Sequence, residues 1–366
     1  MEKEEQAAIA LSLIKGIGVQ MIRALYEHFG SFYAVFKLTD MDLQEIPRLR
    51  KSVLNRANFQ RALDKAAIIL GDNKRNGIRT ILWNSKEYPA RLKHCVDAPT
   101  HLFCSGNGNL EGIKVLSIVG TRKPSPYGKR LMEKISNGLS ESGIQIVSGL
   151  AYGIDTMAHN LALENSLSTI AVLGTPLSNI YPGENRKLAM EIKKNGCLVS
   201  EYYWGQDSVP SNFAMRNRII AGMSDGVIIV ETATKGGAMI TARLGNSYNR
   251  DVFAFPGRVG DLYSSGCNSL IRNNEAHLVE SISDVKRLLG WEANPKRKNP
   301  QASLALDLSD EEQQIFDLIR QLGEPSIDDI AIHLSWEVSK TSVVLLGMEM
   351  KSYVQEIPGK RYLLNV

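Results

Sequence analysis

The stretch VLSIVGTR, residues 115–122, combines a mostly apolar run with a glycine and an arginine at its end. Further apolar runs, rich in β-branched residues, follow at residues 144–147, 169–173, 197–199, 227–230 and 252–255. Amphipathic segments separate most of them. Continuous apolar strands that alternate with helices are typical of a parallel sheet covered on both faces. The sequence therefore predicts an α/β fold, doubly wound around a mostly parallel, Rossmann-like sheet.

Motifs rich in glycine and arginine flank these runs. They are GTR at 120–122 with YGK at 127–129, SGLAYGID at 148–155, and RNR at 216–218 with KGG at 235–237. In a doubly wound sheet, ligands bind outside the carboxyl ends of the strands. Helix starts and glycine turns offer amides to anions, and arginine adds bidentate contacts to phosphate. Several such motifs at one sheet edge favour a ligand with several phosphates, and a nucleic-acid strand fits better than a single nucleotide.

These motifs supply the candidate site. Arg122 and Lys235 are expected to contact phosphates, and the amides of Thr121, Gly149 and Gly236 are expected to cradle them. The full set of candidate DNA-binding residues is Gly120, Thr121, Arg122, Lys129, Ser148, Gly149, Lys187, Arg216, Asn217, Arg218, Lys235, Gly236 and Gly237.

Residues 216–218 are expected to shape the floor of this site. Few carboxylates lie near Arg216 and Arg218 in the sequence, which favours anion binding over a purely structural role. Arg218 is also a candidate internal buttress. Phe213 and Tyr181 lie near the same loops, and aromatic rings hold single strands by stacking on bases. Either ring could equally belong to the core.

The sequence offers little for catalysis. No P-loop is present, and no G-x-G-x-x-G follows a strand. Asp155 and His159 lie four residues apart on one expected helix, but the G-x-S-x-G elbow of hydrolases is absent. We therefore expect a helix-capping Asp155, a packed His159, and no catalytic residue, metal or cofactor. Glu201 and Glu231 follow strands and are expected to anchor loops or arginines.

The segments that flank residues 78–290, the predicted Rossmann-like DNA-binding domain, have other patterns. Residues 1–75 show helical spacing around a GIG turn, which resembles a helix-hairpin-helix or SAM-like domain; the alternative is a helical bundle that only packs. The polar residues 293–307 predict a linker. Residues 308–366 predict three helices and a hairpin, as in a winged helix. Their candidate recognition helix has Lys340 as its one base, so DNA contact and protein contact both stay open.

Composition sets wider limits. The formal net charge of +4 is mild and neither requires nor excludes a polyanion partner. Four widely spaced cysteines form no C-x-x-C pair, which argues against zinc and for reduced thiols. The charged N-terminus does not have the pattern of a signal peptide, and no apolar run approaches membrane-spanning length. We expect a cytoplasmic protein without a membrane partner.

The ordered motifs resemble the DNA-processing protein A (DprA, also called Smf) family. The resemblance covers roughly residues 80–285 and includes SIVGTR at 117–122, SGLAYGID at 148–155, RNRIIAG at 216–222 and FAFPG at 253–257. It implies a cytoplasmic homodimer that binds single-stranded DNA, protects incoming DNA in natural transformation and helps load the RecA recombinase. It also implies no catalytic activity. The dimer would form through the C-terminal part of the Rossmann-like domain, where Leu270 and Ile271 are apolar among polar neighbours.

The chain departs from the family pattern in three loops, which affects the individual phosphate contacts expected there. KGGA at 235–238 stands where the family tends to have Lys-Ser-Gly-Ser, GTP at 174–176 replaces a Gly-x-Gly, and Ala214-Met215 replaces a Phe-Pro. The alternative function is a nucleoside-phosphate hydrolase resembling the lysine-decarboxylase-like Rossmann group. The loop 231–237 is a distant match to that group's glycine-rich signature, but the full Pro-Gly-Gly-x-Gly-Thr-x-x-Glu run is absent.

Overall fold

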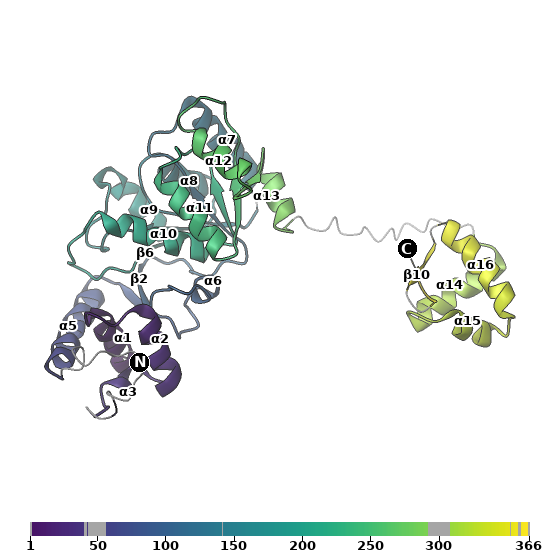
Figure 1. Cartoon of the computed structure of the whole chain (residues 1–366), viewed down its shortest axis with the longest axis horizontal. Helices are drawn as coiled ribbons and strands as arrows, with labels where there is room; N and C mark the ends of the chain where they lie inside the picture. Colours follow the sequence, from purple (N-terminus) through teal and green to yellow (C-terminus); the bar gives the residue numbers. More distant parts are fainter. Residues whose placement is uncertain are drawn as a thin grey trace. The chain divides into compact units, whose positions relative to one another are not determined.

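The computed structural model describes residues 2–39, 42, 56–140, 142–291, 308–351, 353–357 and 360–364 (Figure 1). The chain divides into two compact units, Met1–Glu292 and Ala293–Val366. The predicted linker, 293–307, lies outside the described residues.

A nine-stranded sheet forms the centre of the first unit, within the part of the chain that is described, in the order β1-β2-β6-β5-β4-β3-β7-β8-β9. From β6 to β9 all neighbouring strands are parallel, whereas β1 and β2 add an antiparallel edge. The prediction of a mostly parallel α/β sheet is therefore confirmed. The strands are β1 (Arg79–Leu82), β2 (His101–Ser105), β3 (Val115–Val119), β4 (Gln145–Ser148), β5 (Thr169–Leu173), β6 (Cys197–Ser200), β7 (Gly226–Ile229), β8 (Asp251–Ala254) and β9 (His277–Leu278).

Helices cover both faces of this sheet. Successive side chains of a strand point to opposite faces, so Val119 of β3 packs in one core cluster with α10 and α11, whereas Ile118 packs in another with α7 and α8. The helices that follow β1 are α6 (Ala90–Lys93), α7 (Pro126–Leu139), α8 (Ile154–Glu164), α9 (Arg186–Asn195), α10 (Ser211–Met223), α11 (Gly237–Ser247), α12 (Ser265–Arg272) and α13 (Ile282–Leu288), with a 3₁₀ turn, η2 (Gly183–Asn185), before α9.

The N-terminal helices pack on the β2 and β6 side of the sheet (Figure 1). They are α1 (Glu2–Leu13), α2 (Val19–Phe29), α3 (Phe32–Val35) and α5 (Arg56–Arg75). Ile9 and Ile22 share one core cluster with Phe103 of β2 and Leu198 of β6. Gly16, with a φ of +101°, makes the turn between α1 and α2, a backbone conformation that glycine adopts at little cost. This shared core explains why residues 1–75 fall in the same compact unit as the sheet.

The second unit has its own small core. It contains α14 (Asp310–Leu322), α15 (Ile327–Leu334), α16 (Val338–Met350) and an antiparallel pair, β10 (Val354–Ile357) and β11 (Arg361–Leu364), in the order that the sequence predicts. Ser309 and Ser326 each form a capping box at the start of a helix. Ile315, Leu345 and Met348 are buried at the centre.

Candidate nucleic-acid interface

A cavity of about 420 Å³ opens at the carboxyl ends of β3 and β7, between the starts of α8, α10 and α11. Seven of the candidate residues line it, namely Gly120, Thr121, Arg122, Arg216, Asn217, Gly236 and Gly237. The structure thus brings together three motifs that are separated by up to about 115 residues in the sequence. Ala151, Asp155, Phe213, Thr241 and Tyr263 complete much of the remaining wall.

Glycines hold the loop after β3 directly against the start of α8. A Cβ on Gly120 would lie 2.6 Å from Cγ1 of Ile154, and one on Gly153 would lie 2.3 Å from the Thr121 carbonyl oxygen. Gly153 also has a φ of +78°, which disfavours side chains. The Ile154 amide donates to that same Thr121 carbonyl at 3.1 Å. The two loops therefore form one rigid wall of the cavity.

The three amides expected to cradle phosphate already have partners within the protein. The Thr121 amide donates to the Glu231 carbonyl oxygen at 2.7 Å, and the Gly236 amide donates to the Ala233 carbonyl oxygen at 2.9 Å. The Gly149 amide donates to Oδ2 of Asp155 at 3.1 Å. The prediction was wrong for these amides, because the tight loops that expose glycine backbones also satisfy them.

The start of α11 offers a different set of donors. Gly236, its N-cap, makes no side-chain cap hydrogen bond, and Gly237 and Ala238 of the first turn line the cavity. The first amides of a helix have no intrahelical acceptor, and the helix dipole adds partial positive charge there. Nδ2 of Asn217 donates to the Gly237 carbonyl oxygen at 3.4 Å and ties this helix start to α10.

Arg216 forms the buried floor of the cavity. Its Nη1 donates to the carbonyl oxygens of Gly149, at 2.6 Å, and Val172, so its charge meets dipoles rather than a directly bonded carboxylate. Burial lowers the pKa of Arg216 to about 10, partly offset by the nearby Asp155 carboxylate. Burial likewise raises the pKa of Asp155 to about 6, against the opposing effect of Arg216. Arg216 therefore stays protonated around neutral pH.

Arg218 has a different role from Arg216. Its Nη2 lies 2.6 Å from each carboxylate oxygen of Glu201, both residues being mostly buried. The prediction that Arg218 belongs to the DNA site was wrong, because this ion pair holds the guanidinium inside the protein. The expectation that Glu201 anchors an arginine is confirmed.

Arg122 stands at the exposed mouth of the cavity. It also lines a small adjoining hollow with Gly149, Tyr152, Tyr181 and Phe213. The rings of Tyr181 and Phe213 have centroids 5.4 Å apart with an angle of 58° between their planes, and Tyr181 is 47% exposed. Among the described residues no ion pair or side-chain hydrogen bond involves Arg122. A free guanidinium thus stands beside an open aromatic surface.

Several candidate residues lie outside this cavity. Ser148 is buried and its Oγ donates to the Ile118 carbonyl oxygen at 2.7 Å, so its inclusion was wrong. Lys129 on α7, Lys187 on α9 and Lys235 before α11 are exposed, and none of them lines the cavity walls. Leu270 is fully buried in the core, and this burial corrects the expectation that it forms a dimer interface.

Tyr152 and Tyr263 were missed by the sequence reasoning as site residues. Tyr152 belongs to the SGLAYGID motif, and its hydroxyl donates to Glu184 at 2.6 Å. An aromatic residue within a glycine-rich loop at a strand end was the signal available for it. Ile271, the other expected interface residue, is half-buried and packs against the same core as Leu270.

The residues considered for catalysis have structural partners. Nδ1 of His159 lies 2.8 Å from Oγ1 of Thr169, and burial, with Arg216 nearby, lowers the His159 pKa to about 3. His159 is therefore a packed, neutral imidazole, as expected. The expectation that Asp155 caps the helix was wrong, because Gly153 is the N-cap of α8 and Asp155 accepts a hydrogen bond from the Gly149 amide. Glu231 accepts hydrogen bonds from the Ser125 amide at 2.9 Å and its Oγ at 2.5 Å, which confirms its anchoring role.

The described residues contain no group of three or more His, Cys, Asp or Glu side chains placed to hold a metal ion. None of their helices is both long and apolar enough to cross a membrane.

This chain is similar to known proteins in sequence and in fold. The family model described as DNA recombination-mediator protein A matches residues 79–290. The chain belongs to the DNA-processing protein A family. Its resemblance to that family, inferred above from the motifs, is thereby confirmed. The DNA processing protein DprA of Bacillus subtilis is 35% identical over 284 residues, which cover 77% of this chain and 95% of that protein. Protein Smf of Synechocystis is 31% identical over 99% of both chains.

Solved structures of the family have the same fold. The crystal structure of DNA processing protein A from Streptococcus pneumoniae is 32% identical, with a TM-score of 0.65, and covers 78% of this chain and 97% of that one. The Helicobacter pylori DNA processing protein A, studied for its single-stranded DNA binding mode, is 32% identical with a TM-score of 0.52. That match covers 58% of this chain and 95% of the Helicobacter chain.

Proposed function

We propose that this protein binds single-stranded DNA in the cavity between β3 and β7 and acts as a non-enzymatic mediator of recombination. The observation that carries the proposal is exposed Arg122, which has no ion pair among the described residues and lines one hollow with buried Arg216 and the exposed ring of Tyr181. Phosphate would meet Arg122 and the start of α11, while a base would stack on Tyr181. A similarity to the Helicobacter protein, studied for its single-stranded DNA binding, supports the same assignment.

The candidate residues have distinct proposed roles in this site. Gly120, Thr121 and Gly149 shape walls that bring the strand close to Arg122, and Arg216 and Asn217 support its floor. The exposed lysines at positions 129, 187 and 235 are proposed to meet phosphates outside the cavity. Each neutralised phosphate adds about −0.7 to the log–log salt slope for single strands.

The wider role follows from family membership. We propose that the protein protects incoming DNA during natural transformation and helps load RecA on it, as expected for a member of this family. We also propose a homodimer through the C-terminal part of the Rossmann-like domain. Since Leu270 is buried, the exposed large apolar side chains among the described residues there are Val259, Leu262, Leu278 and Leu288. Light scattering that finds only monomer at micromolar concentration would contradict the dimer.

Arg122→Ala tests the DNA site. We expect single-strand affinity to fall about tenfold or more, because a hydrogen bond to a charged group contributes roughly 1.5–3 kcal/mol. Fluorescence anisotropy with a labelled oligothymidylate at fixed salt measures this. Arg272→Ala is the matched control, since it removes an exposed arginine from α12, away from the cavity walls. Unchanged affinity in a folded Arg122→Ala variant would refute the site.

The hydrolase alternative makes a separate prediction. It requires release of phosphate or base from a nucleoside monophosphate, which a phosphate or chromatographic assay detects directly. The structure gives this alternative little support, because Ser148 and His159 are buried with partners in the core. Turnover that disappears in an Asp155→Asn variant would favour the hydrolase over the binding protein.

A further inference from the structure

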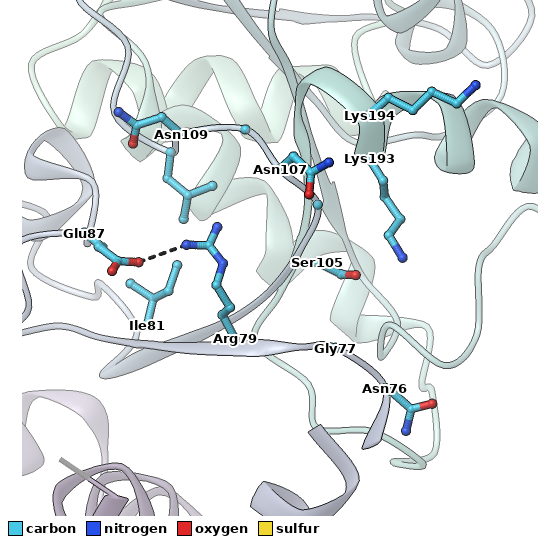
Figure 2. Close-up of a pocket in the computed structure, with 13 residues that line it drawn as sticks. Asn76, Gly77, Arg79, Ile81, Glu87, Ser105, Asn107, Asn109, Lys193 and Lys194 are labelled. Atoms are coloured by element: carbon cyan, nitrogen blue, oxygen red, sulfur yellow. Dashed lines mark hydrogen bonds and ion pairs between the residues drawn. The ribbon is translucent and has the colours of Figure 1, made fainter. Parts of the chain in front are cut away.

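A second, larger cavity of about 890 Å³ lies near the amino end of β6, whereas the first cavity lies at the carboxyl ends of the parallel strands. Figure 2 shows the residues that line this second cavity. Its walls come from the start of β1, the loop after β2 and the end of α9. Its polar and charged residues are Asn76, Arg79, Glu87, Ser105, Asn107, Asn109, Lys193 and Lys194. Neither the family motifs nor the first cavity includes any of them.

The strand directions define this position. β2 runs antiparallel to β6, so the loop that follows Ser105 lies at the amino end of β6, next to Lys193 and Lys194. Arg79 pairs with Cys104 at the same end of β2. The first cavity, in contrast, lies at the carboxyl ends of the parallel strands.

In the walls of this second cavity, the loop after β2 packs tightly against the end of α9. A Cβ on Gly106 would lie 2.4 Å from the Gly196 carbonyl oxygen, and one on Gly108 would lie 2.5 Å from the Gly196 Cα. The Asn107 amide donates to the Lys193 carbonyl oxygen at 3.0 Å, so the loop after β2 is fixed against the end of α9. The side chains of Asn107 and Lys193 are thereby held by a rigid backbone.

Positive charge exceeds negative charge in this cavity. Arg79 pairs with Glu87 at 3.0 Å, and Lys194 pairs with Glu191 of its own helix at 2.6 Å. Lys193 has no ion pair within the described part of the chain, and Figure 2 shows it reaching toward Ser105 while Lys194 extends outward. One unpaired ammonium, one guanidinium with spare donors and several amide side chains suit a phosphate group better than a cation or an apolar ligand.

α9 connects the two cavities. It begins just after Tyr181 and Pro182, which border the Arg122 hollow, and ends at Lys193 and Lys194. Its ten residues span about 15 Å, and Arg186 and Lys187 near its start are exposed. Glu191 is the one acid within α9, and Lys194 pairs with it. Glu184, exposed in the η2 turn just before α9, accepts a hydrogen bond from the Tyr152 hydroxyl. A polyanion leaving the first cavity therefore meets basic side chains at both ends of this helix.

We propose that single-stranded DNA bound at Arg122 continues along α9 and that its phosphates are held in the second cavity by Arg79 and Lys193. This inference rests on the proposed function of the first cavity. It assigns a second contact region to the same strand, near the amino end of β6. Longer strands would therefore bind more tightly and with a steeper salt dependence than strands that reach one cavity only.

The test compares two oligothymidylates across a salt series. One of about 4 nucleotides spans about 10 Å at 3.4 Å per stacked nucleotide, less than α9, and one of about 20 nucleotides exceeds the usual site size of a single fold. The test variant is Lys193→Gln with Lys194→Gln, and Arg79→Gln is a second, independent variant. Lys134→Gln with Arg272→Gln is the control, removing the same charge from exposed positions on α7 and α12.

We expect the lysine variant to weaken binding of the long strand about threefold or more and to reduce its salt slope by about 0.7 for each lost contact. Binding of the short strand should stay unchanged, and the control should match the native protein with both strands. An unchanged salt slope for the long strand in both test variants would overturn the inference. So would an equal loss for both strands, which would indicate a general effect of charge. Arg122→Ala distinguishes failure of the proposed function from failure of this inference. If the proposed function holds, the substitution weakens binding of both strands, whatever the second cavity does.

Discussion

The cavity around Arg122 and the surface of α16 are both candidate DNA contacts, yet they differ in the side chains they expose. The cavity and its adjoining hollow carry an arginine with no ion pair among the described residues, a helix start and an exposed tyrosine. On α16, Lys340 pairs with Glu311 at 2.7 Å, and the exposed stripe consists of Val343, Leu346 and Met350, at 71%, 59% and 82% exposure. A helix placed like a recognition helix but lined with apolar side chains suits protein contact better than phosphate. The cavity and α16 therefore differ in the side chains they expose, although the order of helices and strands makes both of them candidates for DNA contact.

The largest expected effect is that of Arg216→Ala on stability. The substitution leaves the buried carbonyl oxygens of Gly149 and Val172 without the Arg216 donor and takes an opposite charge away from the buried Asp155. Each buried acceptor left without a partner costs about 1–3 kcal/mol, so the two together should cost about 2–6 kcal/mol. Urea unfolding followed by tryptophan fluorescence should show this loss, whereas Lys340→Ala on α16 should change stability by less than about 1 kcal/mol. A stable Arg216→Ala variant would show that the floor of the cavity is not set by this side chain.

The Tyr181→Ala variant tests whether the strand contacts the region of the cavity rather than α16. Stacking of one base on an aromatic ring contributes about 1–3 kcal/mol, so single-strand affinity should fall by about fivefold to a hundredfold. Leu346→Ala on α16 removes an exposed side chain as well and should leave this affinity unchanged. Anisotropy titrations of both variants with one oligonucleotide measure the difference. Equal losses would mean that α16 contacts the strand after all.

The sheet was predictable from sequence where its strands are buried on both faces. Every residue of β3 and β5 is buried, and the runs predicted from the sequence match the observed bounds of these strands, 115–119 and 169–173. The two edge strands, β1 and β9, contain exposed residues, Arg79 in β1 and both residues of β9, so neither produces such a run. β2 is buried throughout, but polar His101 and Ser105 at its ends shorten its apolar run. An edge strand lacks the continuous apolar signal because one side of it meets solvent or a neighbouring helix.

The residues of the candidate DNA site were predictable in part, and the wrong predictions have a common cause. Arg216 and Arg218 lie two residues apart on α10, which turns them about 200° from each other, so both cannot face one cavity. That periodicity was available in the sequence. The partner of Arg218, Glu201, lies 17 residues away in another loop, and no local pattern indicates it. The internal hydrogen bonds of the Thr121 and Gly149 amides likewise depend on tertiary contacts.

Removal of residues 308–366 should leave binding of a single strand to the first unit largely intact. The residues that line the cavity lie between Val119 and Tyr263, and the second unit forms a compact core of its own. A tethered module can add avidity, so a loss of a few-fold is compatible. The salt slope should stay nearly unchanged, because phosphates are neutralised in the first unit. If the truncation removed most of the slope, the second unit would be the principal DNA site and the comparison would be reversed.

The smallest expected effect is on the pH dependence of binding. The pKa of Asp155 is raised to about 6, so its carboxylate is mostly charged at pH 7 and mostly neutral at pH 5. Loss of this negative charge beside Arg216 leaves the cavity more positive, so single-strand affinity should rise as the pH falls through about 6. A phosphate about 10 Å away interacts with such a charge by about 1.7 kcal/mol at an effective dielectric of about 20, before salt screening at a Debye length of about 8 Å. The net gain should therefore be about twofold to threefold.

His159 cannot cause this gain in affinity, because its pKa of about 3 keeps the imidazole neutral throughout this range. Asp155→Asn should bind as tightly at pH 7 as the native protein does at pH 5 and should lose most of the pH dependence. If the dependence persisted in that variant, the charge balance assigned to the floor of the cavity would be wrong.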